Sequence, residues 1–161
     1  MRAKTGGWTM AEMIIVIAVI ALLASVVIPN LVGSKGHARD TSRISDLKQI
    51  QLAFRTWRDD YSTSTYPVYA SGDVIGDGVG VETVFAPYVG GTIKDPIDSG
   101  SNRYYYDSDY TCNGASHVIV MALTMEEATS GNYESVCGAG SEGDLGNGVT
   151  PTAASYVVIL K

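Results

Sequence analysis

The feature of this sequence that most restricts its fold is an uncharged run from Met13 to Ile28, sixteen residues in which Ser25 is the only polar side chain. Extended back to Thr9, the run contains 20 residues. A helix rising ~1.5 Å per residue needs about that length to cross a hydrocarbon layer of ~30 Å. We therefore expect residues 8–28 to form a membrane-spanning helix.

A single acidic residue, Glu12, lies near the start of this apolar segment. An ionised carboxylate in lipid is costly, so it must be neutralised, paired or held close to the headgroups. An ionisable residue inside a membrane segment is by default a candidate functional residue. Glu12 is thus the first candidate site residue of the chain.

The residues around Glu12 belong to a longer pattern: a short basic leader, Met1 to Gly7, a junction between Gly7 and Trp8, the apolar run, and Pro29 after it. Over residues 4–61 this pattern resembles the type IV pilins and the major pseudopilins of type II secretion. In that family a prepilin peptidase removes the leader after its last glycine and methylates the new N-terminus. The resemblance implies that Trp8 is the first mature residue, although most members carry Phe there.

The resemblance also implies a function and its partners. The chain would be a structural subunit of a homo-oligomeric helical filament, held in the inner membrane as a single-pass prepilin with its head outside the cytoplasm, and later part of an extracellular or periplasmic filament. A prepilin peptidase, an assembly ATPase and a platform protein would act on it. Within the filament Glu12 would pair with the Trp8 ammonium of a neighbouring subunit, which would encode the axial register of assembly.

Other functions remain open on the sequence alone. A pilus subunit for adhesion, motility or DNA uptake is not separated from a secretion pseudopilin, and a membrane-tethered adhesin or binding module is a further alternative. An enzyme has almost no support, because the two histidines, His37 and His117, lie far apart in sequence, and neither lies near a cysteine, a serine-containing elbow or a second histidine at metal-ligand spacing. A formal net charge of −6 gives no electrostatic signature of nucleic-acid binding.

Charge is unevenly divided along the chain. Residues 35–60 carry six basic and four acidic side chains, whereas residues 61–161 carry three basic and twelve acidic ones. A basic stalk and an acidic head can attract each other between subunits, or both can be solvated surfaces.

The pattern beyond Ile28 predicts an α+β, pilin-like protein, in which residues 1–7 are a leader, 8–61 a long helix and 62–161 a β-rich head. Pro29, Gly33 and Gly36 should weaken the helix, either as a bend or as an extensible segment. Residues 29–61 are amphipathic, with one polar face and one apolar stripe packed against a small antiparallel sheet. The stripe comprises Ile44, Leu47, Ile50, Phe54, Trp57 and Tyr61, and the polar face comprises Arg39, Asp40, Arg43, Asp46, Lys48 and Arg58.

The head should begin with a turn-rich connector, residues 61–91, containing a short helix near residues 81–88. Strands are expected around residues 103–107, 117–124 and 155–160, which are rich in Tyr, Val and Ile. The middle strand is apolar on both faces, so we expect it to be central. The glycine-rich stretch 138–148 is expected to be a mobile, exposed loop.

Two further predictions concern the head. Its two cysteines, Cys112 and Cys137, suggest one disulfide in an oxidising compartment, the alternative being two buried free thiols. Relatives of the secretion type bind calcium near the region that here contains Asp95, Asp98, Asp107 and Asp109. No EF-hand spacing is present, so we interpret these as solvated loop acids and expect no metal ligands and no cofactor, with calcium in the head loops as the alternative.

Overall fold

The computed structural model describes residues 6–62, 65–69, 72–138, 145 and 150–160, without the side chains of residues 29–33 and 128. The chain falls into two compact units, Met1–Gly36 and His37–Lys161, and each unit is described by itself. Of the leader, residues 1–5 lie outside the described part, and Gly6 and Gly7 are exposed and not helical.

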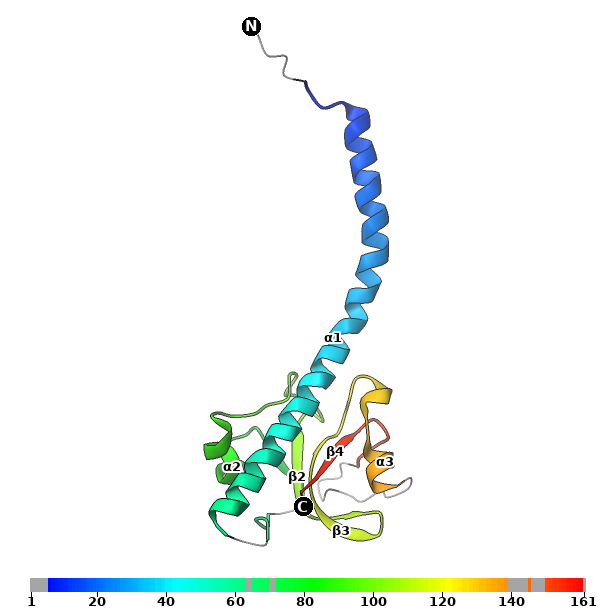
Figure 1. Ribbon diagram of the computed structural model, residues 1–161. Coiled ribbons are helices and arrows are strands. Elements are labelled where there is room, and N and C mark those ends of the chain that lie inside the picture. The colour runs from blue at the N-terminus through cyan, green and yellow to red at the C-terminus, as the bar shows by residue number, and fades with distance from the viewer. Residues whose placement is uncertain (1–5, 63–64, 70–71, 139–144, 146–149, 161) are drawn as a thin grey trace. The chain divides into compact units, whose positions relative to one another are not determined.

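The longest element is helix α1, Met10–Asp60, which contributes to both units (Figure 1). Its bounds agree with the predicted helix 8–61 to within two residues. The helix continues through Pro29. A bend or an extensible segment between Pro29 and Gly36 therefore stays a prediction. In the first unit, Met10–Ile28 is the one described segment that is long and apolar enough to cross a membrane.

In the second unit, the described residues form one four-stranded sheet in the order β1-β2-β3-β4. The strands are β1 (Asp73–Ile75), β2 (Tyr104–Cys112), β3 (Ala115–Ala122) and β4 (Tyr156–Leu160). Each pairs antiparallel with the next. A two-residue turn, Asn113-Gly114, joins β2 to β3 with φ values of 55° and 76°, the left-handed pair that an Asn-Gly hairpin turn requires.

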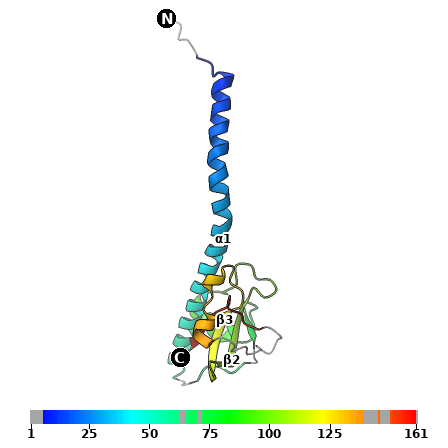
Figure 2. The same cartoon turned by 90° about the vertical axis from the view of Figure 1, so that its right-hand side faces the viewer.

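The later part of α1 lies along one face of the sheet (Figures 1 and 2), and each face of the sheet has its own core. On one face, Leu47, Ile50 and Phe54 of α1 pack against strand residues that include Tyr106 and Val120. On the other face, a second cluster contains Ile119, Met121, Val157, Tyr133 and Leu145. Strand β3 is therefore central and buried on both faces, as its composition predicted. The apolar stripe of α1 is confirmed through Phe54, whereas Tyr61 at its end is exposed.

Three short helical elements complete the head: α2 (Glu82–Val89), the 3₁₀ turn η1 (Ala128–Ser130) and α3 (Tyr133–Cys137). Helix α2 confirms the predicted short helix, whereas β1 and α3 were not predicted. The predicted mobile loop 138–148 lies mostly outside the described residues. Leu145, which is described, is fully buried in the second core, so the expectation of an exposed loop is wrong at that position.

Candidate functional site

The start of α1 places the candidate processing and assembly residues close together. Gly7 and Trp8 are exposed and precede the helix. Thr9 Oγ1 accepts the backbone N–H of Glu12 at 3.3 Å, and the Glu12 carboxylate accepts the backbone N–H and the hydroxyl of Thr9, each at 2.8 Å. This reciprocal arrangement is a capping box, and it satisfies backbone donors that a helix start otherwise leaves unpaired. Glu12 thus has partners within its own chain.

After Glu12, the rest of the segment Met10–Ile28 offers an apolar surface without a charged side chain. None of it is buried within the structure. Its one polar side chain beyond Glu12, Ser25, donates its hydroxyl to the carbonyl of Leu22 at 2.7 Å, so it needs no further partner in an apolar environment. The segment is therefore suited to lipid or to the apolar side chains of other helices.

In the second unit, Arg43 of α1 is the centre of a buried ion-pair cluster. Its side chain is fully buried. Nε donates to Asp95 Oδ2 at 2.6 Å and Nη2 donates to Asp95 Oδ1 at 3.1 Å. Nη1 donates to Asp40 Oδ1 at 2.8 Å and lies 3.4 Å from Glu126 Oε1. The planar guanidinium suits such a two-pronged contact with a carboxylate.

Asp40 connects this cluster to the segment after β3. Its carboxylate oxygens accept the backbone N–H groups of Glu126 and Glu127 at 2.9 and 2.8 Å. Nearer the surface, Arg39 makes a two-pronged ion pair with Glu126, and His37 Nδ1 lies 3.3 Å from Glu127 Oε2. Residues 37–43 of α1 are thus fastened to two separate loops of the head.

Burial and charge act in opposite directions on the ionisable groups of this cluster. Burial favours the neutral forms of Arg43 and Asp40, yet the Asp95 and Asp40 carboxylates raise the pKa of Arg43 above its ordinary value. Likewise the N–H groups of Glu126 and Glu127, with Arg43, hold the pKa of Asp40 below its ordinary value despite burial. Arg43 and Asp40 are therefore both charged at neutral pH.

These contacts correct the predicted polar face of α1. Arg43 and Asp40 were expected on the solvated face, but both are buried, at 0% and 1% exposure. They also show attraction between the basic helix and the acidic head within one chain, whereas the sequence left open either contacts between subunits or two solvated surfaces. No pattern in the sequence indicates that Arg43 pairs with Asp95, because Asp95 lies 52 residues away along the chain.

The predicted disulfide is present. Cys112 at the end of β2 and Cys137 at the end of α3 are bonded, with their Cα atoms 4.5 Å apart. Both residues are fully buried in the second core. The bond therefore fastens α3 to the sheet.

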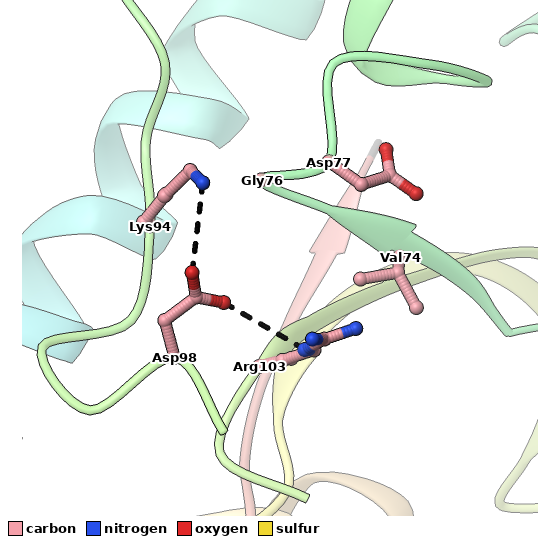
Figure 3. A pocket seen from close by; sticks show the side chains of 6 residues that line it. All are labelled: Val74, Gly76, Asp77, Lys94, Asp98 and Arg103. Carbon is pink, nitrogen blue, oxygen red and sulfur yellow. Dashed lines mark ion pairs between the residues drawn. The ribbon is translucent and has the colours of Figure 1, made fainter. Parts of the chain in front are cut away.

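The four acids considered for calcium do not behave as a group. Asp95 and Asp107 are buried, so their interpretation as solvated loop acids is wrong. Asp98 lies 3.5 Å from Lys94 Nζ and 3.6 Å from Arg103 Nε, in a pocket of about 180 Å³ (Figure 3). Among the described residues, no three His, Cys, Asp or Glu side chains gather as metal ligands would. The absence of a metal ligand stays a prediction, with calcium in the head loops as its alternative.

Comparison with known proteins gives matches over part of the chain. The type II secretion system core protein G of Aeromonas hydrophila is 31% identical over 71 residues, 44% of this chain and 48% of that protein. The core protein G of Escherichia coli is 39% identical over 62 residues, 37% of this chain and 43% of that protein. The type IV wide pilus major component PilA4 of Thermus thermophilus is 36% identical over 61 residues, 36% of this chain and 47% of that protein.

The chain thus spans about half the length of the curated relatives it matches. No family model matches the chain, and no solved structure matches it significantly. The fold is nevertheless the expected one: a single long N-terminal helix, apolar up to Ile28 and amphipathic in its later part, followed in the chain by a four-stranded antiparallel sheet. Together, the partial matches and the α+β fold relate this chain to the type IV pilins and the type II secretion pseudopilins.

Proposed function

We propose that this chain is a structural subunit of a type IV pilus-like filament, held in the inner membrane by Met10–Ile28 with its head outside the cytoplasm. The observation that carries the proposal is the placement of Glu12, the one charged side chain of the exposed apolar segment Met10–Ile28, at the fifth residue after the Gly7–Trp8 junction. A prepilin peptidase would cleave after Gly7, and an assembly ATPase and a platform protein would drive polymerisation. Catalysis has no place in this function.

In this proposal Glu12 serves two states of the protein. In the membrane, its carboxylate is held by Thr9. In the filament, it pairs with the Trp8 ammonium of a neighbouring subunit, because an apolar core tolerates the carboxylate only where a cation meets it. Heterologous contacts between apolar helices then extend without closing into a ring.

Substitution of Glu12 separates its two roles. A Gln side chain at this position of a capping box can still accept the backbone N–H of the residue at the helix start, but it carries no charge. Filaments should therefore be absent from both Glu12→Ala and Glu12→Gln cells, while both proteins remain in the membrane fraction. Electron microscopy of sheared surface fibres and fractionation check this. Normal filaments from Glu12→Gln would show that capping alone is needed and would contradict the charge pair.

The processing step has an independent test. Mass spectrometry of the purified protein should find Trp8 as a methylated N-terminus, and Gly7→Val should leave the leader attached. Cleavage within the apolar segment, or an intact leader on the unsubstituted protein, would instead support a secreted protein or a simple membrane tether.

A secretion pseudopilus is the second candidate, because type II secretion system core proteins G outnumber pilus components among the similar proteins. The two filaments differ in what is lost on deletion of the subunit. A pilus role predicts the loss of surface fibres, whereas a pseudopilus role predicts that secreted proteins accumulate inside the envelope while surface fibres remain.

A further inference from the structure

A small pocket next to strand β1 is lined by Val74, Gly76, Asp77, Lys94, Asp98 and Arg103, and we call it the Arg103 pocket (Figure 3). The side chains of Lys94 and Arg103 both turn toward Asp98. The Asp98 carboxylate lies 3.5 Å from Lys94 Nζ and 3.6 Å from Arg103 Nε. Charges attract at these distances, but hydrogen bonds are usually shorter. Asp98 therefore holds the two cations only loosely.

Arg103 has an unused donor in this pocket. Its Nε is removed from solvent, and among the described residues it is the one buried side-chain nitrogen or oxygen without a hydrogen-bond partner. Native proteins leave few buried polar atoms unpaired, so such an atom calls for an explanation. The Arg103 side chain as a whole is 42% exposed, so a ligand in the pocket can reach the guanidinium. An acceptor supplied from outside the chain would satisfy this donor.

A tight turn fixes the position of Arg103 opposite Asp98. Ser99 and Asn102 form an isolated antiparallel bridge, in which the Asn102 N–H donates to the Ser99 carbonyl at 3.0 Å. Asp98 and Arg103 flank this turn on its two sides, and Arg103 directly precedes β2. The guanidinium is thus carried by the residue next to a strand, which is the rigid support that a binding site needs.

The backbone around Lys94 is fixed from two directions. Gly76 lies so close to it that a Cβ at this glycine would be 3.2 Å from the Ile93 carbonyl oxygen and 3.3 Å from Lys94 Cγ. On the other side, Asp95 accepts two hydrogen bonds from Arg43 of α1. The Lys94 backbone is therefore anchored both to the segment after β1 and to α1.

The charges next to Arg103 favour an anion. Lys94, Arg103 and Asp98 contribute two positive charges and one negative charge. Asp77, the second acid of the pocket, already accepts the backbone N–H of Val79 at 3.0 Å, and its carboxylate points away from Asp98 in Figure 3. A metal ion would meet two like charges beside Asp98, whereas one negative charge would neutralise the three residues.

The shape and charge of the lining select the kind of anion. The planar guanidinium of Arg103 matches the two oxygens of a carboxylate in a two-pronged contact. A phosphate group carries a charge of about −1.5 to −2 at pH 7, which Asp98 and Asp77 oppose. The pocket volume of about 180 Å³ is below the ~300–1,000 Å³ of sites for drug-sized ligands. The pocket therefore suits a carboxylate on a short stem.

We propose that the Arg103 pocket binds a small monovalent carboxylate. The ligand oxygens accept hydrogen bonds from the Arg103 guanidinium, including the unpaired Nε, and one of them pairs with Lys94 Nζ. Asp98 gives way from Arg103 as the ligand enters, because its contact there is long. A free organic acid and the acidic side chain of another protein present the same group. The site lies wholly within the second unit and goes beyond the proposed filament function.

Titration of the full chain in detergent micelles with sodium acetate tests this site, at pH 7 and at an ionic strength held constant with sodium chloride. NMR should show a saturable shift of the Arg103 Nε–H, because it gains an acceptor, and the backbone amide of residue 98 reports binding in every variant. Arg103→Lys, which keeps the charge but loses the planar fork, and Lys94→Gln should each weaken binding about tenfold. Arg55→Gln, which removes an exposed cation of α1, should have no effect.

Asp98→Asn gives a test in the opposite direction. Asn is suited to the left-handed φ of 44° at this position, and the substitution removes the charge that competes with the ligand. Acetate should therefore bind about fivefold more tightly, the effect of removing a like charge at ~4 Å under the screening of water. If Arg103→Lys does not fold, this variant decides, because it keeps both cations.

Two further ligands identify the source of the carboxylate. N-acetylglutamate α-amide, which carries a side-chain carboxylate, should bind, whereas its glutamine analogue should not. Binding tighter than that of acetate assigns the site to a protein side chain, and equal or weaker binding assigns it to a free small acid. The proposal is overturned if the Arg103 shift grows linearly with acetate, if chloride produces it equally, if Arg103→Lys retains full affinity, if Asp98→Asn does not tighten binding, or if phosphate binds more tightly than acetate.

Discussion

Arg43 and Asp95 form a two-pronged ion pair in which both side chains are almost completely removed from solvent, at 0% and 1% side-chain exposure. Asp95 also accepts the backbone N–H of Ile97 at 2.8 Å, which fixes the turn around Pro96. The pair thus connects the geometry of a surface turn directly to helix α1. Loss of one partner would leave the other charge buried and unpaired.

Substitution of Arg43 should therefore be costly. Arg43→Ala should lower the free energy of unfolding by about 3–5 kcal/mol, because Asp40 and Asp95 lose their buried cation. Arg39→Ala, which breaks the partly exposed pair with Glu126, should cost much less than Arg43→Ala, because solvent screens that pair. Chemical denaturation of the full chain in detergent, followed by near-ultraviolet circular dichroism, checks both. Equal costs would contradict a special role for burial.

The stability of the head should depend on pH through the ionisation of Asp46. Burial raises the pKa of Asp46 above its ordinary value of 3.8, and the charge of Asp95 raises this pKa further. The hydroxyl of Tyr104, which donates to the Asp46 carboxylate at 2.7 Å, offsets part of the increase. The folded state therefore binds the proton more tightly than the unfolded state. As pH rises from about 3.8 through the raised pKa of the folded state, Asp46 should make the head less stable.

Asp46→Asn should remove this contribution. The variant should unfold at higher denaturant concentration than the unsubstituted protein at pH 7, and the difference should shrink toward pH 4. Asp59→Asn, which alters an exposed acid of the same helix, should show neither effect. A loss of stability in Asp46→Asn at pH 7 would instead mean that the ionised carboxylate is needed as an acceptor for Tyr104.

The disulfide should contribute a substantial share of the stability of the head. In the chain-entropy model, a bond between residues 25 positions apart stabilises by about 3 kcal/mol. Cys112→Ala/Cys137→Ala should lose about that amount, and reduction of the unsubstituted protein should have the same effect. Protease sensitivity should increase first around α3, because the second core depends on it. Unchanged unfolding after complete reduction would contradict this.

Gly131 should be intolerant of any side chain. In Gly131→Ala the new Cβ would overlap backbone atoms of Ala153 and Ala154, which cannot move as a flexible side chain would, so we expect a loss of about 1–3 kcal/mol. Gly91→Ala is the matched control, because no atom lies within 4 Å of its Cβ. Thermal unfolding of both variants distinguishes this steric effect from the general effect of adding a methyl group.

Features set by local pattern were predictable. The bounds of α1, the short helix α2 and the central position of β3 follow from hydrophobic periodicity and β-rich composition, which act over a few residues. The capping box was missed although its signal is local, the Thr-x-x-Glu spacing of Thr9 and Glu12. This spacing predicts from the sequence alone that Thr9 is a hydrogen-bond partner of Glu12.

Features set by distant contacts were not predictable. A periodicity argument places Arg43 on a polar face because it considers only the type of side chain, whereas its burial depends on Asp95, 52 residues away. Helix α3 has five residues and β1 has three, too few for a periodic signal. The disulfide at Cys137 and pairing of β1 with Tyr104–Tyr106 support these elements.

The hydrogen bonds that Glu12 receives from Thr9 bear on whether assembly can be reversed. Because the carboxylate already has two donors in its own chain, joining a Trp8 ammonium in a filament would exchange one set of partners for another. The free energy of that step is the difference between two satisfied states, which is smaller than the full cost of burying a bare charge. If the chain forms the filament proposed above, a subunit that leaves it would therefore recover its own cap.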